Sequence, residues 1–150
     1  MARYSLRWGC LRLNHAVDYL NSLHNASAAN ENALAENQLA NPFYNMLQVK
    51  RSLASHISEM VSKRNSTILL TGHAGDGKTA LLFQVLDELS TEPLPSRIHE
   101  CGILSLNGTD RKLLYVKDMS ELPHDCQEAL LLKALKAPSE GHSSILVSNT

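Results

Sequence analysis

The residues from Gly72 to Thr79 read Gly-His-Ala-Gly-Asp-Gly-Lys-Thr and follow the pattern G-x-x-x-x-G-K-S/T. Glycines let a backbone wrap closely around phosphate groups, so that successive N–H groups converge on the anion. A helix that begins at Lys78 would add the positive end of its dipole at the same place. We therefore predict a triphosphate-binding loop in which Lys78 reaches the β- and γ-phosphates and the Thr79 hydroxyl binds Mg²⁺.

The loop as a whole is expected to contact the nucleotide. His73 and Asp76 occupy its variable positions, and a solvent-facing spacer is a more typical role for His73 than catalysis. A glycine-rich turn followed by an unrelated lysine is the alternative interpretation of the segment. The predicted nucleotide-binding residues are Gly72, His73, Ala74, Gly75, Asp76, Gly77, Lys78, Thr79 and Ala80.

A triphosphate site of this kind needs a carboxylate on Mg²⁺, usually at the end of a neighbouring strand. Asp118 follows an apolar run and is predicted to fill that role, although Lys117 interrupts the run. Met119 stands where many ATPases place a catalytic glutamate, so Glu121 becomes the candidate base that activates water. The alternative is that Asp118 and Ser120 cap a turn while Glu121 is a solvated surface residue.

A second polar position follows the apolar run 144–147, where the chain continues as Ser148-Asn149-Thr150. A polar residue at the carboxyl end of a strand beside the loop strand would face the γ-phosphate. Asn149 is therefore a candidate for holding the attacking water. Simple termination of the strand by polar residues is an equally good interpretation.

The elements that must position these residues follow from the apolar pattern. Asn41 and Pro42 are typical of a helix start, and apolar residues at helical spacing continue to Val61. Thr67 to Thr71 predicts a buried strand that leads into the loop. After Lys78, leucines and a valine recur at three- to four-residue spacing, which predicts a helix.

Two strand-like runs, 103–106 and 113–116, flank the pair Asn107-Gly108, a strong signal for a β-hairpin. A hairpin does not fit a purely parallel sheet, in which a crossover connection is expected. The remaining predicted elements are a helix over 125–137, which Pro138 ends, and a strand over 144–147.

The composition is that of an ordinary globular chain of 150 residues, with 43% hydrophobic and 19% charged residues and a net charge of -1. Residues 1–40 are expected to form a partly helical or poorly ordered lead-in, and residues 41–150 the folded core. Cys10, Cys101 and Cys126 show neither metal-ligand nor disulfide spacing, which favours reduced thiols in a cytoplasmic protein. No apolar run is long enough to span a bilayer, so no membrane association is expected.

The order of helix, strand, loop, helix, acidic strand end, helix and Asn-tipped strand resembles the core of AAA+ and STAND-type ATPases. The resemblance implies a three-layer α/β P-loop NTPase core with a mostly parallel sheet, and ATP and Mg²⁺ as cofactors. Asp118 matches the Walker B position and Asn149 matches sensor 1. The segment Asn41 to Tyr44 is similar to the linker that often touches adenine in these families.

The strings GHAGDGKT, YVKDMSEL and SNT are also similar to ATPases of bacterial defence systems, such as the DNA phosphorothioation-dependent restriction ATPases. This resemblance implies nucleic acid as an ultimate partner, and a homo-oligomer or a defence complex as the assembly. We also expect the chain to be the N-terminal part of a longer ATPase domain, truncated before the last strand and the helical lid, and weakly active by itself.

Three functions fit these residues. The first is Mg²⁺-dependent ATP hydrolysis that drives a conformational switch or motor, with Lys78, Glu121 and Asn149 as catalytic residues. The second is a nucleotide-binding module that assembles without turnover. The third is a small-molecule phosphotransferase, which would need an arginine-rich lid; residues 80–150 hold only Arg97 and Arg111.

Overall fold

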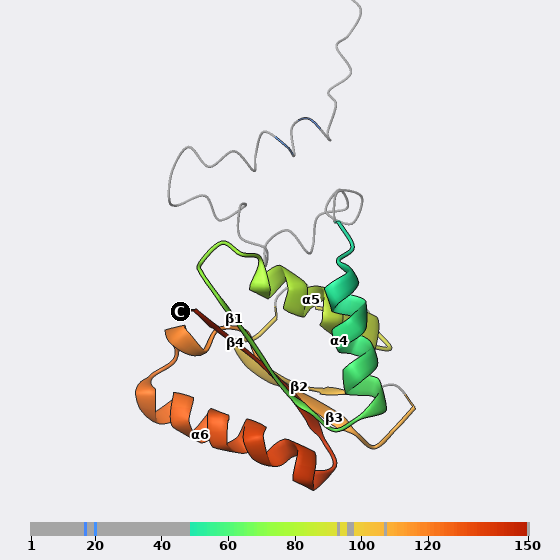
Figure 1. Cartoon of the computed structure of the whole chain (residues 1–150), viewed down its shortest axis with the longest axis vertical. Helices are drawn as coiled ribbons and strands as arrows, with labels where there is room; N and C mark the ends of the chain where they lie inside the picture. The colour runs from blue at the N-terminus through green and yellow to red at the C-terminus, as the bar shows by residue number, and fades with distance from the viewer. Residues whose placement is uncertain are drawn as a thin grey trace, which may run out of the picture. The chain divides into compact units, whose positions relative to one another are not determined.

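The computed structural model of the chain describes Val17, Leu20 and residues 49–92, 94–95, 98–106 and 108–149. Contacts divide the chain into two compact units, Met1–Leu47 and Gln48–Thr150, and the elements named below belong to the second. In chain order they are α4 (Ser52–Lys63), β1 (Thr67–Gly72), α5 (Lys78–Leu89), β2 (Cys101–Ser105), β3 (Lys112–Val116), the short 3₁₀ helix η2 (Met119–Glu121), α6 (His124–Lys136), the 3₁₀ helix η3 (Ala137–Glu140) and β4 (Ser143–Asn149) (Figure 1).

The four strands form one open sheet in the order β1-β4-β3-β2. β4 pairs in parallel with both β1 and β3, whereas β2 is antiparallel to β3. The predicted mostly parallel α/β sheet is therefore confirmed, and so is the predicted pairing of the two runs around residues 107–110. The Leu106 N–H donates to the Arg111 carbonyl at 3.0 Å to close that hairpin, whose Asn107 lies outside the described residues.

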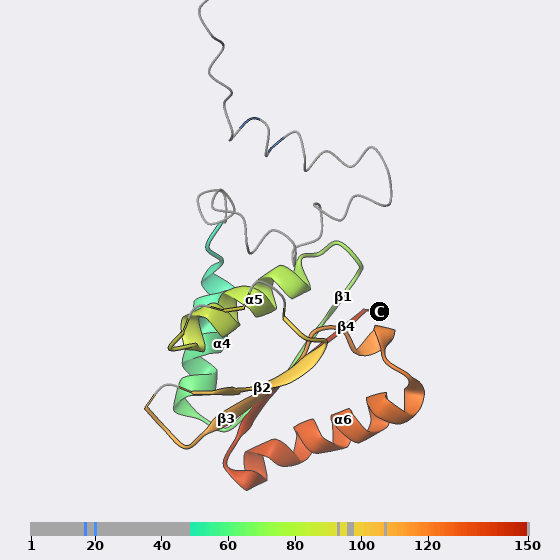
Figure 2. The same ribbon diagram turned by 180° about the vertical axis from the view of Figure 1, so that it is seen from behind.

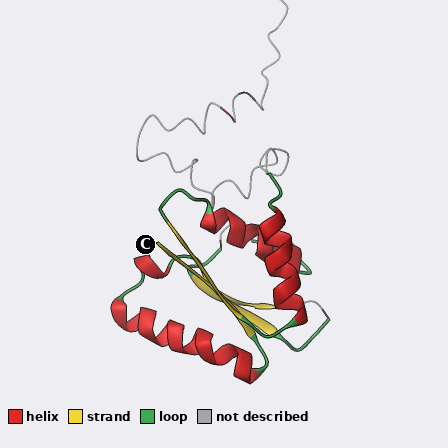
Figure 3. Cartoon of the chain, viewed as in Figure 1, coloured by secondary structure: helices red, strands yellow, loops and turns green. Residues whose placement is uncertain are grey.

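Helices cover both faces of this sheet. α4 and α5 lie side by side on one face and α6 lies on the other, as Figure 1 and the reverse view in Figure 2 show; Figure 3 separates the helices from the strands by colour. α5 buries almost its whole length, with Phe83 only 1% exposed. On the α6 face the buried cluster comprises Leu114, Val116, Met119, Ala134 and Leu146.

The end of α6 is tied to the sheet through one carbonyl group. In a continuing helix the Ala134 carbonyl would accept the N–H of residue 138, but Pro138 has no N–H to give. The hydroxyl oxygens of Thr67 on β1 and Ser144 on β4 lie 2.8 Å and 2.9 Å from that carbonyl oxygen and replace the missing donor. The helix predicted over 125–137 is confirmed to within one residue at each end, and a short 3₁₀ helix, η3, follows it.

The first predicted helix also differs from the structure. α4 begins at Ser52 after the extended Arg51, so the helix expected from Pro42 does not run through residues 49–51, and its first residues lie outside the described part. Gln84 of α5 explains the break, because its amide accepts the Arg51 N–H and donates to the Val49 carbonyl, and Arg51 is extended.

The register places three strand ends together at one edge of the sheet. Gly72 at the end of β1 pairs with Asn149 on β4, and Val116 at the end of β3 pairs with Leu146. The carboxyl edge of an open α/β sheet is where such folds bind ligands. β4 lies beside the loop strand as predicted, but it also separates β1 from β3, so the acidic strand is not the direct neighbour that was expected.

Candidate functional site

The loop after β1 is braced by its own aspartate. The Asp76 carboxylate accepts the His73 N–H at 2.8 Å, and the His73 carbonyl accepts the Asp76 N–H at 3.3 Å. Both side chains are exposed. Asp76 therefore fixes the turn, and His73 occupies the solvent-facing position expected of a spacer.

Lys78 is folded over this loop. Its ammonium group donates to the Gly72 carbonyl at 2.9 Å and to the His73 carbonyl at 2.6 Å. The side chain is thus held at the mouth of the loop by two weak neutral acceptors. Because charged acceptors make stronger hydrogen bonds, phosphate oxygens would compete well for the same ammonium group.

The amino end of α5 is not capped by a side chain. Gly77 is the N-cap residue and provides no side-chain cap, and the first turn contains no acidic residue. The first N–H groups of a helix lack intrahelical partners and carry the positive end of the dipole. These N–H groups and the Lys78 ammonium group make the loop suited to binding an anion. Thr79 and Ala80 lie half-buried in the same first turn.

Asp118 and Asn149, predicted separately from the sequence, are in direct contact. One Asp118 carboxylate oxygen accepts the Asn149 side-chain amide at 2.6 Å, and the other accepts the Ser120 N–H at 2.8 Å. The Asn149 N–H in turn donates to the Ser120 hydroxyl at 3.0 Å. The capping interpretation of Asp118 and Ser120 is therefore correct as geometry, and the same carboxylate lies at the carboxyl edge of the sheet.

The position after Asp118 belongs to the core. Met119 is 9% exposed and packs in the cluster beneath α6. Glu121 is exposed at the end of the same 3₁₀ turn, and its side chain makes no hydrogen bond within the part of the chain that the structure describes. The structure thus brings Asp118 and Asn149 together and leaves Glu121 apart from them.

Thr79 and Asp118 fit Mg²⁺ only together with a nucleotide. Among the described residues no three His, Cys, Asp or Glu side chains gather as a metal site. Mg²⁺ commonly takes one or two protein oxygens and completes its shell with phosphates and water. The Thr79 hydroxyl in the first turn of α5 and the Asp118 carboxylate after β3 are oxygen ligands of that kind.

An ion pair beside Asp118, formed by a buried lysine and a half-exposed glutamate, was not predicted. Lys117 is 3% exposed, and its ammonium group lies 2.8 Å from the Glu100 carboxylate. The backbone N–H of Lys117 also donates to the backbone carbonyl of Glu100 at 2.7 Å. Burial raises the pKa of the neighbouring Tyr115 phenol, the Cys101 thiolate raises it further, and the Lys117 charge partly offsets both. The sequence signal was the single lysine in an apolar run, which indicates a paired rather than a free cation.

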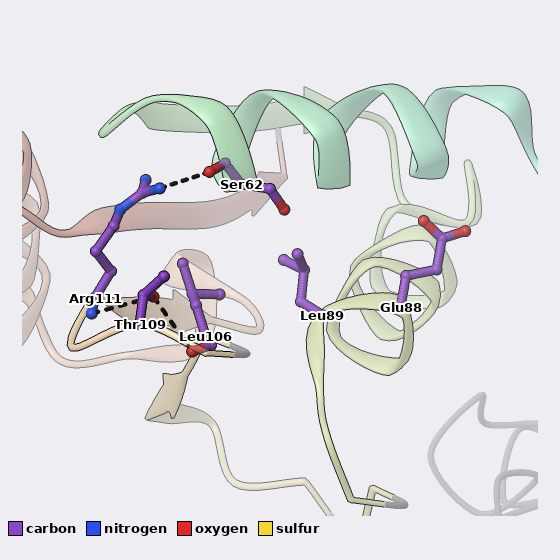
Figure 4. A pocket seen from close by; sticks show the side chains of 6 residues that line it. All are labelled: Ser62, Glu88, Leu89, Leu106, Thr109 and Arg111. Carbon is purple, nitrogen blue, oxygen red and sulfur yellow. Dashed lines mark hydrogen bonds between the residues drawn. The ribbon is translucent and has the colours of Figure 1, made fainter.

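Arg111 lies at the opposite edge of the sheet, before the first residue of β3. Its guanidinium donates to the Val61 and Ser62 carbonyls at 2.7 Å and 2.6 Å, which caps the carboxyl end of α4. The same side chain lines a cavity of about 110 Å³ whose other walls come from α4, α5 and the hairpin connection (Figure 4). Arg111 is therefore structural and far along the strand from Asp118; Arg97 lies outside the described residues.

A larger cavity of about 490 Å³ opens between α6 and the uncovered side of β1. Leu69, 55% exposed, and Leu131 contribute to its apolar wall, and Thr71 brings it close to the loop. Within the described residues no helix has the length and apolar character that crossing a bilayer requires. Cys101 and Cys126 are free and exposed, whereas Cys10 lies outside the described part.

Comparisons of this chain with protein-family models, with curated proteins and with solved structures found no match.

Proposed function

We propose that the chain binds Mg·ATP at residues 72–80 and hydrolyses it. The observation that carries the proposal is the Lys78 ammonium group, held on two loop carbonyls between the end of a parallel strand and an uncapped helix start. An anion with several oxygens can replace both carbonyls and use the helix amides at the same time.

Each group then has one task. Lys78 would exchange the loop carbonyls for β- and γ-phosphate oxygens, and Thr79 with Asp118 would hold Mg²⁺, which would supply charge neutralisation for the phosphates. The Asn149 side chain donates to Asp118 at 2.6 Å, which supports its proposed role in orienting the attacking water. Glu121 is the candidate base, and among the described residues no hydrogen bond joins its side chain to Asp118 or Asn149. Phosphate–protein contacts stabilise the charge that develops on the transferred group.

The second candidate is a nucleotide-binding module without turnover. The observation in its favour is that Met119 is packed in the core while Glu121 is exposed and unbonded among the described residues. A phosphotransferase is less well supported, because Arg111 is engaged at the other edge of the sheet. A role as a switch or motor in DNA-linked antiviral defence, with homo-oligomer or complex partners, rests on the sequence resemblance.

Calorimetric titration with Mg·ATP tests the binding step. Lys78→Ala should weaken ATP binding by about 10- to 100-fold, since it removes charge-assisted hydrogen bonds. Asp118→Ala should abolish the dependence of ATP affinity on Mg²⁺. Lys136→Ala, which removes an exposed lysine from the last turn of α6, is the control and should bind like the wild type.

Equal binding by the wild type and Lys78→Ala, or no binding by a folded wild type, would refute the nucleotide site. Phosphate release then separates the two candidate functions. Slow turnover that falls further in Asn149→Ala supports hydrolysis, and retention of intact ATP by the wild type supports the module.

A further inference from the structure

An extended segment just before α4 is attached to the loop helix by one side chain. The buried Gln84 amide of α5 accepts the Arg51 N–H at 3.2 Å and donates to the Val49 carbonyl at 3.0 Å. The amide thus satisfies one backbone donor and one backbone acceptor, as a neighbouring strand would. This fixes where the backbone of Arg51 lies relative to the first turns of α5.

The anchored Arg51 reaches the junction between loop and helix. Its guanidinium donates to the Gly77 carbonyl at 3.0 Å, and that carbonyl also accepts the Leu81 N–H at 2.9 Å. A second guanidinium nitrogen would lie 2.5 Å from a Cβ placed on Gly77. The guanidinium therefore rests directly against the backbone of this glycine.

Gly77 is a position where such a contact can restrict the backbone. Glycine has the largest backbone freedom of any residue, and Gly77 caps α5 without any side-chain hydrogen bond. The direction of the first helix amides depends on this residue, because they follow it directly. A planar guanidinium that is itself anchored by Gln84 restricts the junction.

We infer that Arg51 is a positioning residue of the nucleotide loop. It acts through Gly77, holding the loop–helix junction so that the amides of the first turn of α5 point at the phosphates. This inference rests on the proposed nucleotide site, but the geometry of the empty loop tests it independently of ATP.

The experiment uses the full chain as wild type, Arg51→Ala, Arg51→Lys and Lys50→Ala. Lys50 is exposed and adjacent, so its loss removes the same charge without the Gly77 contact. Arg51→Ala should weaken Mg·ATP binding by about 3- to 10-fold, the effect of losing one such hydrogen bond. Arg51→Lys should recover part of the loss, and Lys50→Ala should bind like the wild type.

Amide hydrogen exchange without nucleotide provides the second measurement. Arg51→Ala and Gln84→Met should exchange faster over residues 73–81, whereas Lys50→Ala should not. Thermal midpoints show whether a variant is folded, and the exchange at α6 shows whether an effect is local.

The inference is overturned if Arg51→Ala matches the wild type in both affinity and loop exchange while Lys78→Ala loses binding. It is also overturned if Lys50→Ala weakens binding as much, because the effect would then be general charge. If the folded wild type binds no ATP, the proposed function fails, and loop exchange alone decides whether Arg51 orders the junction.

Discussion

Gly77 shows how a single residue sets the geometry of the loop. Its φ of 76° lies in the left-handed region, and its carbonyl is the acceptor for both Leu81 and Arg51. Gly141, at the end of η3, has a similar φ of 83°, but a Cβ there would meet nothing within 4 Å. The two glycines therefore share a backbone requirement and differ in surroundings.

Gly77→Ala and Gly141→Ala should each lower the free energy of unfolding by about 1–2 kcal/mol, the cost of a side chain in the left-handed region. Only Gly77→Ala should also weaken Mg·ATP binding, because its Cβ displaces the Arg51 guanidinium. Denaturant unfolding and calorimetry measure the two effects. Unchanged affinity in a folded Gly77→Ala protein would contradict this assignment.

The site residues that could be predicted from the sequence were those that a local motif or a position after an apolar run identifies. Lys78 follows the glycines of its motif, and Asp118 and Asn149 follow apolar runs, so each could be placed at a strand end or helix start. Arg51 and Gln84 carry no such signal. Their contact joins positions 33 residues apart, and only the packing of α4 against α5 brings them together.

At the scale of elements, most strands and helices and their approximate bounds could be predicted from the sequence, but the order of the strands in the sheet could not. The hairpin was predictable because its turn is local, whereas the insertion of β4 between β1 and β3 depends on long-range packing. The helix expected from Pro42 failed at residues 49–51 for the same reason, because Gln84 competes for that backbone.

The connection between α6 and the sheet gives a prediction at this scale. Thr67→Val and Ser144→Ala should each cost about 0.5–1.5 kcal/mol of unfolding free energy, since each leaves the Ala134 carbonyl one donor. The cost of the double variant should differ from their sum for two reasons. The carbonyl then has neither hydroxyl and Pro138 supplies no N–H, which adds to the cost. The 3.1 Å hydrogen bond from the Ser144 hydroxyl to the Thr67 hydroxyl, which each single variant already breaks, is lost only once.

Thr71→Val, on the same face of β1 but exposed, is the control and should change stability little. A denaturant double-mutant cycle measures the coupling. Strict additivity of Thr67→Val and Ser144→Ala would contradict the coupling of the two hydroxyls through this carbonyl and through their own hydrogen bond.

At the scale of the whole molecule, the unit Gln48–Thr150 has its own buried core on both faces of the sheet. A chain that starts at Gln48 should therefore unfold cooperatively. A chain that starts at Ser52 keeps every helix and strand of this unit but lacks the Val49 and Arg51 backbone that Gln84 bonds.

The chain starting at Ser52 should be less stable by about 1–3 kcal/mol, because the Gln84 amide, 8% exposed, loses both partners. For a domain of this size that corresponds to a fall in midpoint of about 4–8 °C per kcal/mol. Acetylating Ser52 removes the new terminal charge from the start of α4, which would otherwise oppose the helix dipole. If the acetylated chain has the same thermal midpoint as the chain from Gln48, residues 48–51 do not stabilise the fold. The Gln84 contact then cannot be what anchors Arg51 beside the loop.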